Sequence, residues 1–258
     1  YRCRMNRRQL LIGSGSSLLP TCGWSQPAAR LPIVGFVGFA SSAADNQSLV
    51  PFREALRDLG RIEGRTIQVE ARSADGDVGR GLRHIGELIA RPVDVFLSPG
   101  PAATRAIFRL TKIPVVAVAL PADRTDEGMF ESLARPGGTV TGFSAFGEEL
   151  SAKRIQMIRE ALPRLKVVGV LHNATDPMFR AWGEQTMADA RKQGLEPVRL
   201  SIEAPSVAAL EGHIRKLREA GGTALIVIRD FLTTTLMHEI CRVAAGEGLA
   251  VVGEHSEW

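Results

Sequence analysis

Leu133-Ala-Arg-Pro-Gly-Gly-Thr-Val-Thr-Gly142 lies between two long segments of the chain that share one internal pattern. Pro136 and the two glycines after it favour a turn, and Val140 opens a short β-branched run. A connection of this kind between two similar segments is typical of a crossover between two lobes. The sequence therefore predicts two lobes that are joined near this stretch.

The segment before this stretch alternates apolar runs of strand length with amphipathic runs of helical spacing. The predicted strands are residues 31–39, 66–71, 93–97, 115–119 and 140–143. The predicted helices are residues 48–59, 78–91 and 101–110, the last with proline in its first turn.

The segment after it repeats the alternation. Helices are predicted over residues 148–162, 177–193, 207–220 and 233–245, and strands over 166–171, 196–200, 224–228 and 249–252. Continuous apolar strands between amphipathic helices indicate parallel sheets covered on both faces. We therefore predict an α/β protein with two doubly wound, Rossmann-like lobes. The N-terminal lobe comprises residues 31–143 and the C-terminal lobe residues 144–258.

The first 30 residues have the order of an export signal. We take Met5 as the start; Arg7 and Arg8 follow, then a mild apolar run over residues 10–19 and small residues up to Ala29. The Arg-Arg-x-Leu-Leu form resembles a twin-arginine signal. We expect a periplasmic protein exported by the twin-arginine or the general secretion route. The alternative is a disordered basic tail.

The charge of the chain is concentrated in this leader. The formal net charge is +4, but residues 1–30 hold five arginines and no acid, which leaves 27 basic against 28 acidic residues. A near-neutral body lacks the basic footprint of a nucleic-acid binder. Cys241 is the one cysteine beyond the leader, so no internal disulfide is expected. Cys22 as a lipid anchor is the less favoured alternative to a soluble product, and no transmembrane helix is predicted.

Motifs of catalysis and metal binding are missing from the sequence. Gly142-Phe-Ser-Ala-Phe146 lacks the second glycine of a nucleophile elbow, and His238-Glu239 lacks the second histidine of a zinc-protease motif. The five histidines have no ligand spacing, and there is no P-loop. We predict no catalytic residue, metal ligand or cofactor.

Several short segments of the sequence, at matching spacing, resemble those of one protein family. They are Phe52 to Gly60, Leu88 to Ala103, Ile113 to Val116, Leu133 to Gly138, Leu162-Pro163 and Leu171-His-Asn173. Together they resemble the ABC-transporter substrate-binding family that includes tryptophan- and tyrosine-binding proteins. The resemblance runs from about Leu31 to Val252.

The resemblance implies a type I periplasmic binding protein fold. It also implies a small polar solute, amino-acid-like, bound between the lobes and delivered to an ABC permease in the inner membrane; we expect a monomer. Members of the family continue beyond the end of this sequence, so the resemblance further implies a truncated chain whose final crossover is missing.

In open α/β sheets a ligand binds at the carboxyl ends of the strands, near helix N-termini. The candidate ligand-binding residues at those ends are Ser41, Ser42, Ser98, Ala102, Ala103, Thr104, Asn173, Asp176 and Asp230. The helix after Ser98 could hold a carboxylate on its free N–H groups, and Asp230 would suit an ammonium group. Family resemblance favours the 98–104 loop, Asn173 and Asp230.

For each polar candidate the alternative is a helix cap or a turn. His172 stands where members of the family often carry an aromatic residue. If it faces the cleft, the stacking contribution to an aromatic ligand is altered.

Three other functions remain open. One is a truncated, non-functional paralogue of the binding proteins. Another is a periplasmic-binding-like effector or sensor domain of a transcription regulator, which would need a helix-turn-helix where the leader stands. A Rossmann-type enzyme is disfavoured by the missing motifs.

Overall fold

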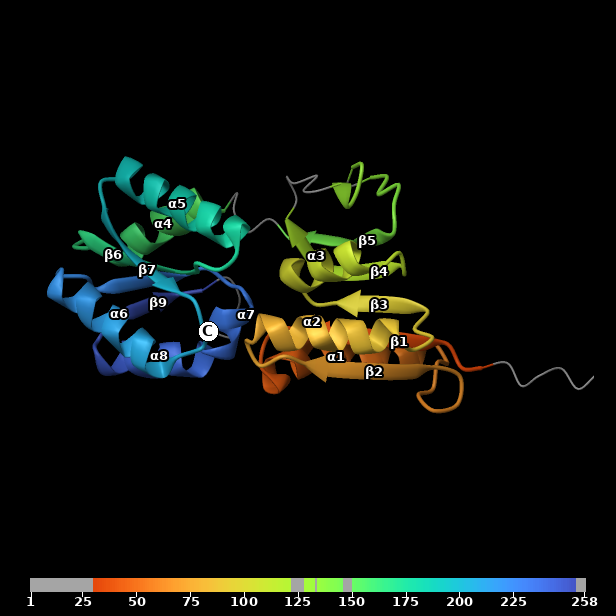
Figure 1. The fold of residues 1–258 in the computed structure, drawn as a ribbon. Helices are drawn as coiled ribbons and strands as arrows, with labels where there is room; N and C mark the ends of the chain where they lie inside the picture. Colours follow the sequence, from red (N-terminus) through yellow and green to blue (C-terminus); the bar gives the residue numbers. More distant parts are fainter. Residues whose placement is uncertain (1–29, 122–127, 133, 146–149, 254–258) are drawn as a thin grey trace, which may run out of the picture. The chain divides into compact units, whose positions relative to one another are not determined.

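A computed structural model of the chain describes residues 30–121, 128–132, 134–145 and 150–253 (Figure 1). The predicted export signal, apart from Arg30, and the last five residues lie outside the described ranges. In the part that is described, none of the helices combines the length and the apolar character that a membrane span requires.

The first half of the chain folds into a wholly parallel sheet with strand order β2-β1-β3-β4-β5. Its strands are β1 (Ile33–Gly38), β2 (Gln68–Ser73), β3 (Val95–Ser98), β4 (Val115–Pro121) and β5 (Val140–Ala145). Its helices are α1 (Ser42–Asp58), α2 (Val78–Ile89) and α3 (Pro101–Leu110). Each helix places an apolar stripe on the sheet. Leu49 of α1 packs with Phe36 on one face, and Ile85 of α2 and Ile107 of α3 pack with Phe96 on the other.

The second half forms a second parallel sheet with strand order β7-β6-β8-β9. Its strands are β6 (Val167–Asn173), β7 (Glu196–Ile202), β8 (Ala224–Val227) and β9 (Ala250–Val252). Its helices are α4 (Ser151–Ala161), α5 (Pro177–Lys192), α6 (Val207–Glu219), α7 (Phe231–Thr235) and α8 (Met237–Gly246). Helices α4 and α5 cover one face and α6 and α8 the other (Figure 1).

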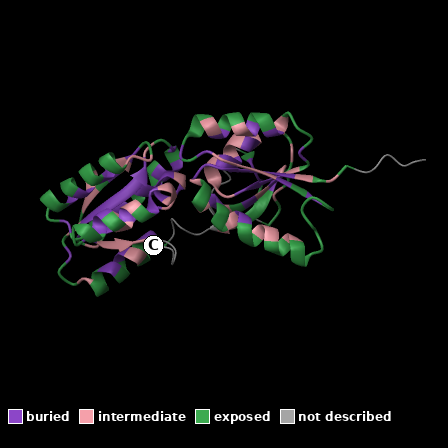
Figure 2. Ribbon diagram, turned by 90° about the horizontal axis from the view of Figure 1, so that it is seen from below, coloured by how far each residue is buried: buried purple, intermediate pink, exposed green. Residues whose placement is uncertain are grey.

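Burial follows this layering in both halves. The central strands are buried, and the helices turn their exposed sides outward (Figure 2). Strand β8 is buried at all four positions, as expected of a parallel strand covered on both faces. The predicted α/β class with parallel sheets is confirmed.

The segment that was predicted to connect two lobes has a different place. Residues 134–138 lead into β5, which pairs in parallel with β4 and so belongs to the first sheet. Gly137 has a φ of +70°, and a Cβ there would overlap the Glu131 side chain. The Pro-Gly-Gly turn therefore closes a connection within one sheet, and the chain passes to the second sheet only after Ala145.

Most helices end within three residues of their predicted limits, but two of the predictions are wrong in a larger way. Helix α1 begins at Ser42 rather than at residue 48, because the buried position one turn before Leu49 is taken by Asp45, and an aspartate does not register as apolar periodicity. The helix predicted over residues 233–245 is two helices, α7 and α8, which meet at Leu236.

Candidate ligand-binding site

The strand orders define one topological switch point in each sheet. Strand β1 has β2 on one side and β3 on the other, and β6 lies likewise between β7 and β8. Helices that follow the two strands of such a pair leave toward opposite faces, so the loops at the carboxyl ends part and leave a crevice. All nine predicted site residues lie at the carboxyl ends of β1, β3, β6 and β8: in the last residue of the strand, in the loop after it, or in the first turn of the next helix.

After β1, the two predicted serines are engaged in local structure. Ser41 is the N-cap of α1, and its hydroxyl accepts a hydrogen bond from the Ala44 N–H at 3.3 Å. Ser42 donates its backbone N–H to Asp75 Oδ1 at 3.1 Å and its hydroxyl to the same oxygen at 3.3 Å. These bonds join the loop after β1 to the loop after β2.

After β3, a small hydroxyl cluster shapes the start of α3. The Thr104 hydroxyl lies 2.8 Å from Ser98 Oγ and 2.9 Å from the Gly100 carbonyl, and Ser98 Oγ lies 3.2 Å from that carbonyl. Ser98 and Thr104 are fully buried. Their hydroxyls therefore hold the turn around Gly100.

The N-terminus of α3 has no side-chain cap. Its N-cap residue is Gly100, which supplies no side-chain oxygen, and Pro101 follows at the first helical position. Ala102 is half-buried, whereas the Ala103 side chain is buried in the core of the first sheet. Only the backbone of Ala103 can thus serve a ligand, and the first-turn N–H groups of this helix lack the acceptor that a capping side chain provides.

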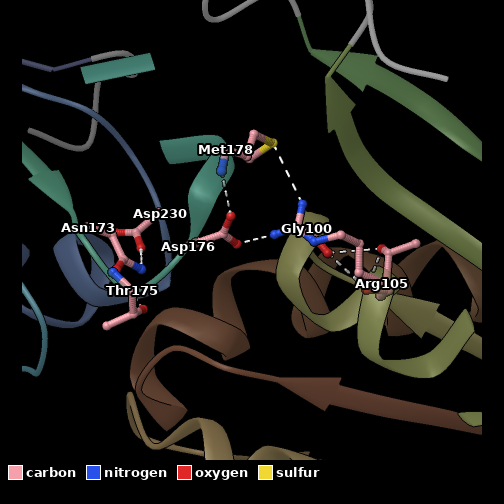
Figure 3. Close-up of polar contacts among 9 residues, drawn as sticks. Gly100, Arg105, Asn173, Thr175, Asp176, Met178 and Asp230 are labelled. Atoms are coloured by element: carbon pink, nitrogen blue, oxygen red, sulfur yellow. Dashed lines mark hydrogen bonds and ion pairs between the residues drawn. The ribbon is translucent and has the colours of Figure 1, made fainter. Parts of the chain in front are cut away.

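After β6 and β8, Asn173 and Asp230 form a buried pair (Figure 3). Asn173 Nδ2 donates to Asp230 Oδ2, and Asn173 Oδ1 accepts the Thr175 N–H and hydroxyl, each at 2.7 Å. Asp230 also caps α7: its Oδ1 accepts the Thr233 N–H at 2.9 Å, and its own N–H donates to the Thr233 hydroxyl at 2.8 Å. The pair ties together the two switch-point loops of the second sheet.

The electrostatics of Asp230 follow from this burial. Burial raises the pKa of its carboxyl to about 6, and hydrogen bonds from Thr233 and Asn173 offset part of the rise. Both carboxylate oxygens already accept hydrogen bonds from protein groups. An ammonium group would have to share this carboxylate with existing donors.

Asp176 connects the second sheet to the first. It is the N-cap of α5, where its Oδ1 accepts the Met178 N–H at 2.9 Å. Its other oxygen accepts a hydrogen bond from Arg105 Nη2 of α3 in a largely buried ion pair (Figure 3). Arg105 Nη1 lies 3.7 Å from Met178 Sδ. The pair joins residues 71 positions apart in the chain.

His172 faces α5. Its ring packs against Gly183, where a Cβ would come within 2.8 Å of the ring, and its Nε2 lies 3.3 Å from the Ser201 hydroxyl. Burial holds the pKa of His172 below its usual value. The condition for an altered stacking surface, a histidine facing the cleft, is therefore not met.

Sequence reasoning did not single out Arg105 as a site residue. A signal was present, because it is the one charged residue among Pro101 to Ile107, which are otherwise small or apolar apart from Thr104. An isolated arginine in the first two turns of a helix that starts at a switch point is expected to pair with an anionic group. Among the described residues, no group of three or more His, Cys, Asp or Glu side chains is arranged to hold a metal ion.

Comparison with known proteins decides the family. The model of the ABC transporter substrate-binding protein family matches residues 34–253, which is most of the chain. The chain belongs to this family. A curated relative of this substrate-binding protein, the tyrosine-binding protein of Clostridioides difficile, is 24% identical over 208 residues. That match covers 78% of this chain and 57% of the relative, so the chain spans little more than half the length of that protein.

Solved structures share the fold. A conserved domain protein from Vibrio cholerae matches this substrate-binding protein with a TM-score of 0.77 at 19% identity. An ABC domain in complex with L-Trp from Streptococcus pneumoniae matches with a TM-score of 0.75 at 18% identity. Each match covers 88% of this chain and 75% of the other. The predicted type I periplasmic binding protein fold is confirmed.

Proposed function

We propose that the protein is the exported solute-binding component of an ABC importer. It binds a small, polar, amino-acid-like solute between the switch-point loops of its two sheets and delivers it to an inner-membrane permease from the periplasm. The lobes close on the solute by a hinge motion driven by contacts made only in the closed state. Family membership and the tyrosine- and L-Trp-binding relatives support this solute class.

The observation that carries the proposal is the start of α3. It lies at the switch point of the first sheet, and its first-turn N–H groups have no side-chain cap because the N-cap residue is Gly100. A helix N-terminus of this kind favours an anion through its N–H groups and the helix dipole. The carboxylate of an amino acid fits these requirements.

Substitution Ala102→Glu tests this assignment. Position 102 is the second helical position of α3, where a glutamate favours the helix through the dipole but repels a bound carboxylate. We expect the chain to stay folded, which melting curves check, and the affinity for L-tryptophan or L-tyrosine to fall at least about tenfold by isothermal titration. Ala208→Glu, at the equivalent position of α6, is the matched control and should leave affinity unchanged.

The outcomes separate clearly. Equal affinity in Ala102→Glu and the wild type removes the α3 N-terminus from the site. A wild-type chain whose melting temperature responds to no solute in a panel of the twenty amino acids, sugars and nucleosides contradicts the solute-binding role itself.

Export has a separate test. Residues 5–30 fused to a reporter should carry it to the periplasm, and changing Arg7 and Arg8 to Lys should stop transport by the twin-arginine route. A reporter that is exported regardless of this change would assign the leader to general secretion. A reporter retained in the cytoplasm in both forms would contradict export by this segment.

A further inference from the structure

Arg105 is a largely buried cation whose partners come from the other half of the chain. Its side chain is 13% exposed. It projects from α3, on the first sheet, but its guanidinium contacts Asp176 and Met178, both at the start of α5 on the second sheet (Figure 3). A buried guanidinium needs an anion close by, because an uncompensated buried charge is costly. If the two sheets part to admit a solute, Arg105 loses its anion.

Asp176 depends much less on this pair. Its Oδ1 accepts the Met178 N–H, and the N-terminus of α5 stabilises its negative charge through the helix dipole. When the pair breaks, Asp176 therefore still caps α5, and its Oδ2 can accept a hydrogen bond from a new donor. Arg105 is left with five N–H donors and a need for a carboxylate.

We propose that Arg105 and Asp176 are the specificity-determining pair of the site and select a zwitterionic α-amino acid. The solute carboxylate replaces Asp176 on Arg105, and the solute ammonium replaces Arg105 on Asp176. This inference rests on the proposed solute-binding function and adds to it a residue, Arg105, and a reason for the solute class. The exchange replaces one ion pair with two, so binding a zwitterion leaves no buried charge alone.

A solute with a single charge is rejected by the same logic. An amine satisfies Asp176 but leaves Arg105 without an anion, and an acid satisfies Arg105 but leaves Asp176 without a cation. Hydrogen bonds to charged groups are the stronger ones, and losing one corresponds to a factor of about 10 to 100 in affinity. The wild-type chain should therefore bind the zwitterion at least about tenfold more tightly than either singly charged analogue.

Three matched probes test the pair by isothermal titration on the full 258-residue chain. L-tryptophan carries both charges, tryptamine lacks the carboxylate, and indole-3-propionate lacks the ammonium group. If another member of the twenty amino acids is the best binder, its own amine and acid take their places. Arg105→Gln should weaken L-tryptophan binding about 10- to 100-fold and leave tryptamine within about threefold of wild type.

Asp176→Asn is the mirror experiment. Asparagine is a good N-cap, so α5 should keep its start while the negative charge is lost. This variant should lose the discrimination between L-tryptophan and indole-3-propionate and keep that between L-tryptophan and tryptamine. Arg215→Gln on α6, an exposed position, is the control and should change none of the ratios. Melting curves establish that each variant is folded.

Each outcome decides between the alternatives. Equal changes for all three probes in Arg105→Gln would mean that the pair only holds the sheets together, and would overturn the inference while leaving the proposed function standing. Binding of uncharged solutes alone, such as 5-methylthioribose, would overturn both the inference and the amino-acid-like solute class of the proposed function. Failure of the wild type to bind any of these solutes would overturn both.

Discussion

At the scale of single residues, Asp45 is a buried acid in the first turn of α1. It is 3% exposed, and its Oδ2 has no hydrogen-bond partner among the described residues. A Cβ at Gly38 would overlap its carboxyl group, so glycine at the end of β1 makes room for it. Burial raises the pKa of Asp45 to about 6, a hydrogen bond with Ser73 lowers it in part, and the nearby Asp75 raises it further.

This pKa gives a direction for the dependence of stability on pH. An acid whose pKa is higher in the folded than in the unfolded state stabilises the fold below the unfolded value of 3.8, and that contribution is lost as pH rises through 6. A shift of this size corresponds to roughly 2 to 3 kcal/mol. Asp45→Asn, which cannot ionise, should remove that part of the fall in the free energy of unfolding between pH 4 and pH 7.

Urea denaturation at pH 4, 5, 6 and 7 measures the free energy of unfolding of the wild type and of Asp45→Asn. Asp58→Asn, at the exposed end of the same helix, serves as the control and should follow the wild-type profile. A profile for Asp45→Asn that is parallel to the wild type would show that Asp45 does not titrate in this range.

At the scale of elements, the short helix α7 depends on its start. Five residues are too few for a helix to be stable by itself, so the capping box of Asp230 and Thr233 fixes it. Asp230 also accepts a hydrogen bond from the Asn173 amide, so it both caps α7 and holds the loop after β6. Asp230→Ala should lower the free energy of unfolding by about 2 to 4 kcal/mol, from the lost cap and the buried amide left without its acceptor.

The comparison is with Ser206→Ala, which removes the half-exposed cap of α6 and should cost about 1 kcal/mol in the same urea denaturation. Equal costs would show that the Asn173 contact adds nothing. Because Asp230 organises the loop, a loss of ligand affinity in Asp230→Ala would not by itself identify a ligand contact. Thr233→Val, which breaks the box and keeps the carboxylate, distinguishes the two causes.

At the scale of the whole molecule, side-chain contacts between the described residues of the two sheets hold them together. One is an edge-to-face pair of Phe39, which follows β1, and Phe231, the first residue of α7, with ring centroids 5.7 Å apart. Phe39 belongs to the core of the first sheet, and Phe231 packs against the cores of both. A double-mutant cycle of Phe39→Leu and Phe231→Leu should give a coupling free energy of about 0.5 to 1.5 kcal/mol.

The control cycle pairs Phe231→Leu with Phe36→Leu, since Phe36 packs on the α1 face of the first sheet and has no ring contact with Phe231. That cycle should be additive within about 0.5 kcal/mol. Additivity in the Phe39 cycle as well would mean that the ring contact does not couple the sheets in solution.

The sequence determined the order and type of nearly every element and the loops in which polar residues gather. The alternation of buried strands and amphipathic helices is a local property, set by side chains within one or two turns of each other. This local pattern predicted the helix starts at Pro101 and Pro177 correctly. It did not predict the start of α1, because Asp45 occupies a buried position there.

Which of those polar residues meet depends on the three-dimensional packing of the chain. Strand order put β6 beside β8 and so brought Asn173 to Asp230 across 57 residues. The packing of α3 against the start of α5 brought Arg105 to Asp176 across 71. The tertiary structure also packs the His172 ring against Gly183 of α5. The order of the strands and the packing of the sheets fix which residue becomes the partner of a buried charge. A local sequence pattern does not encode a contact between residues so far apart in the chain.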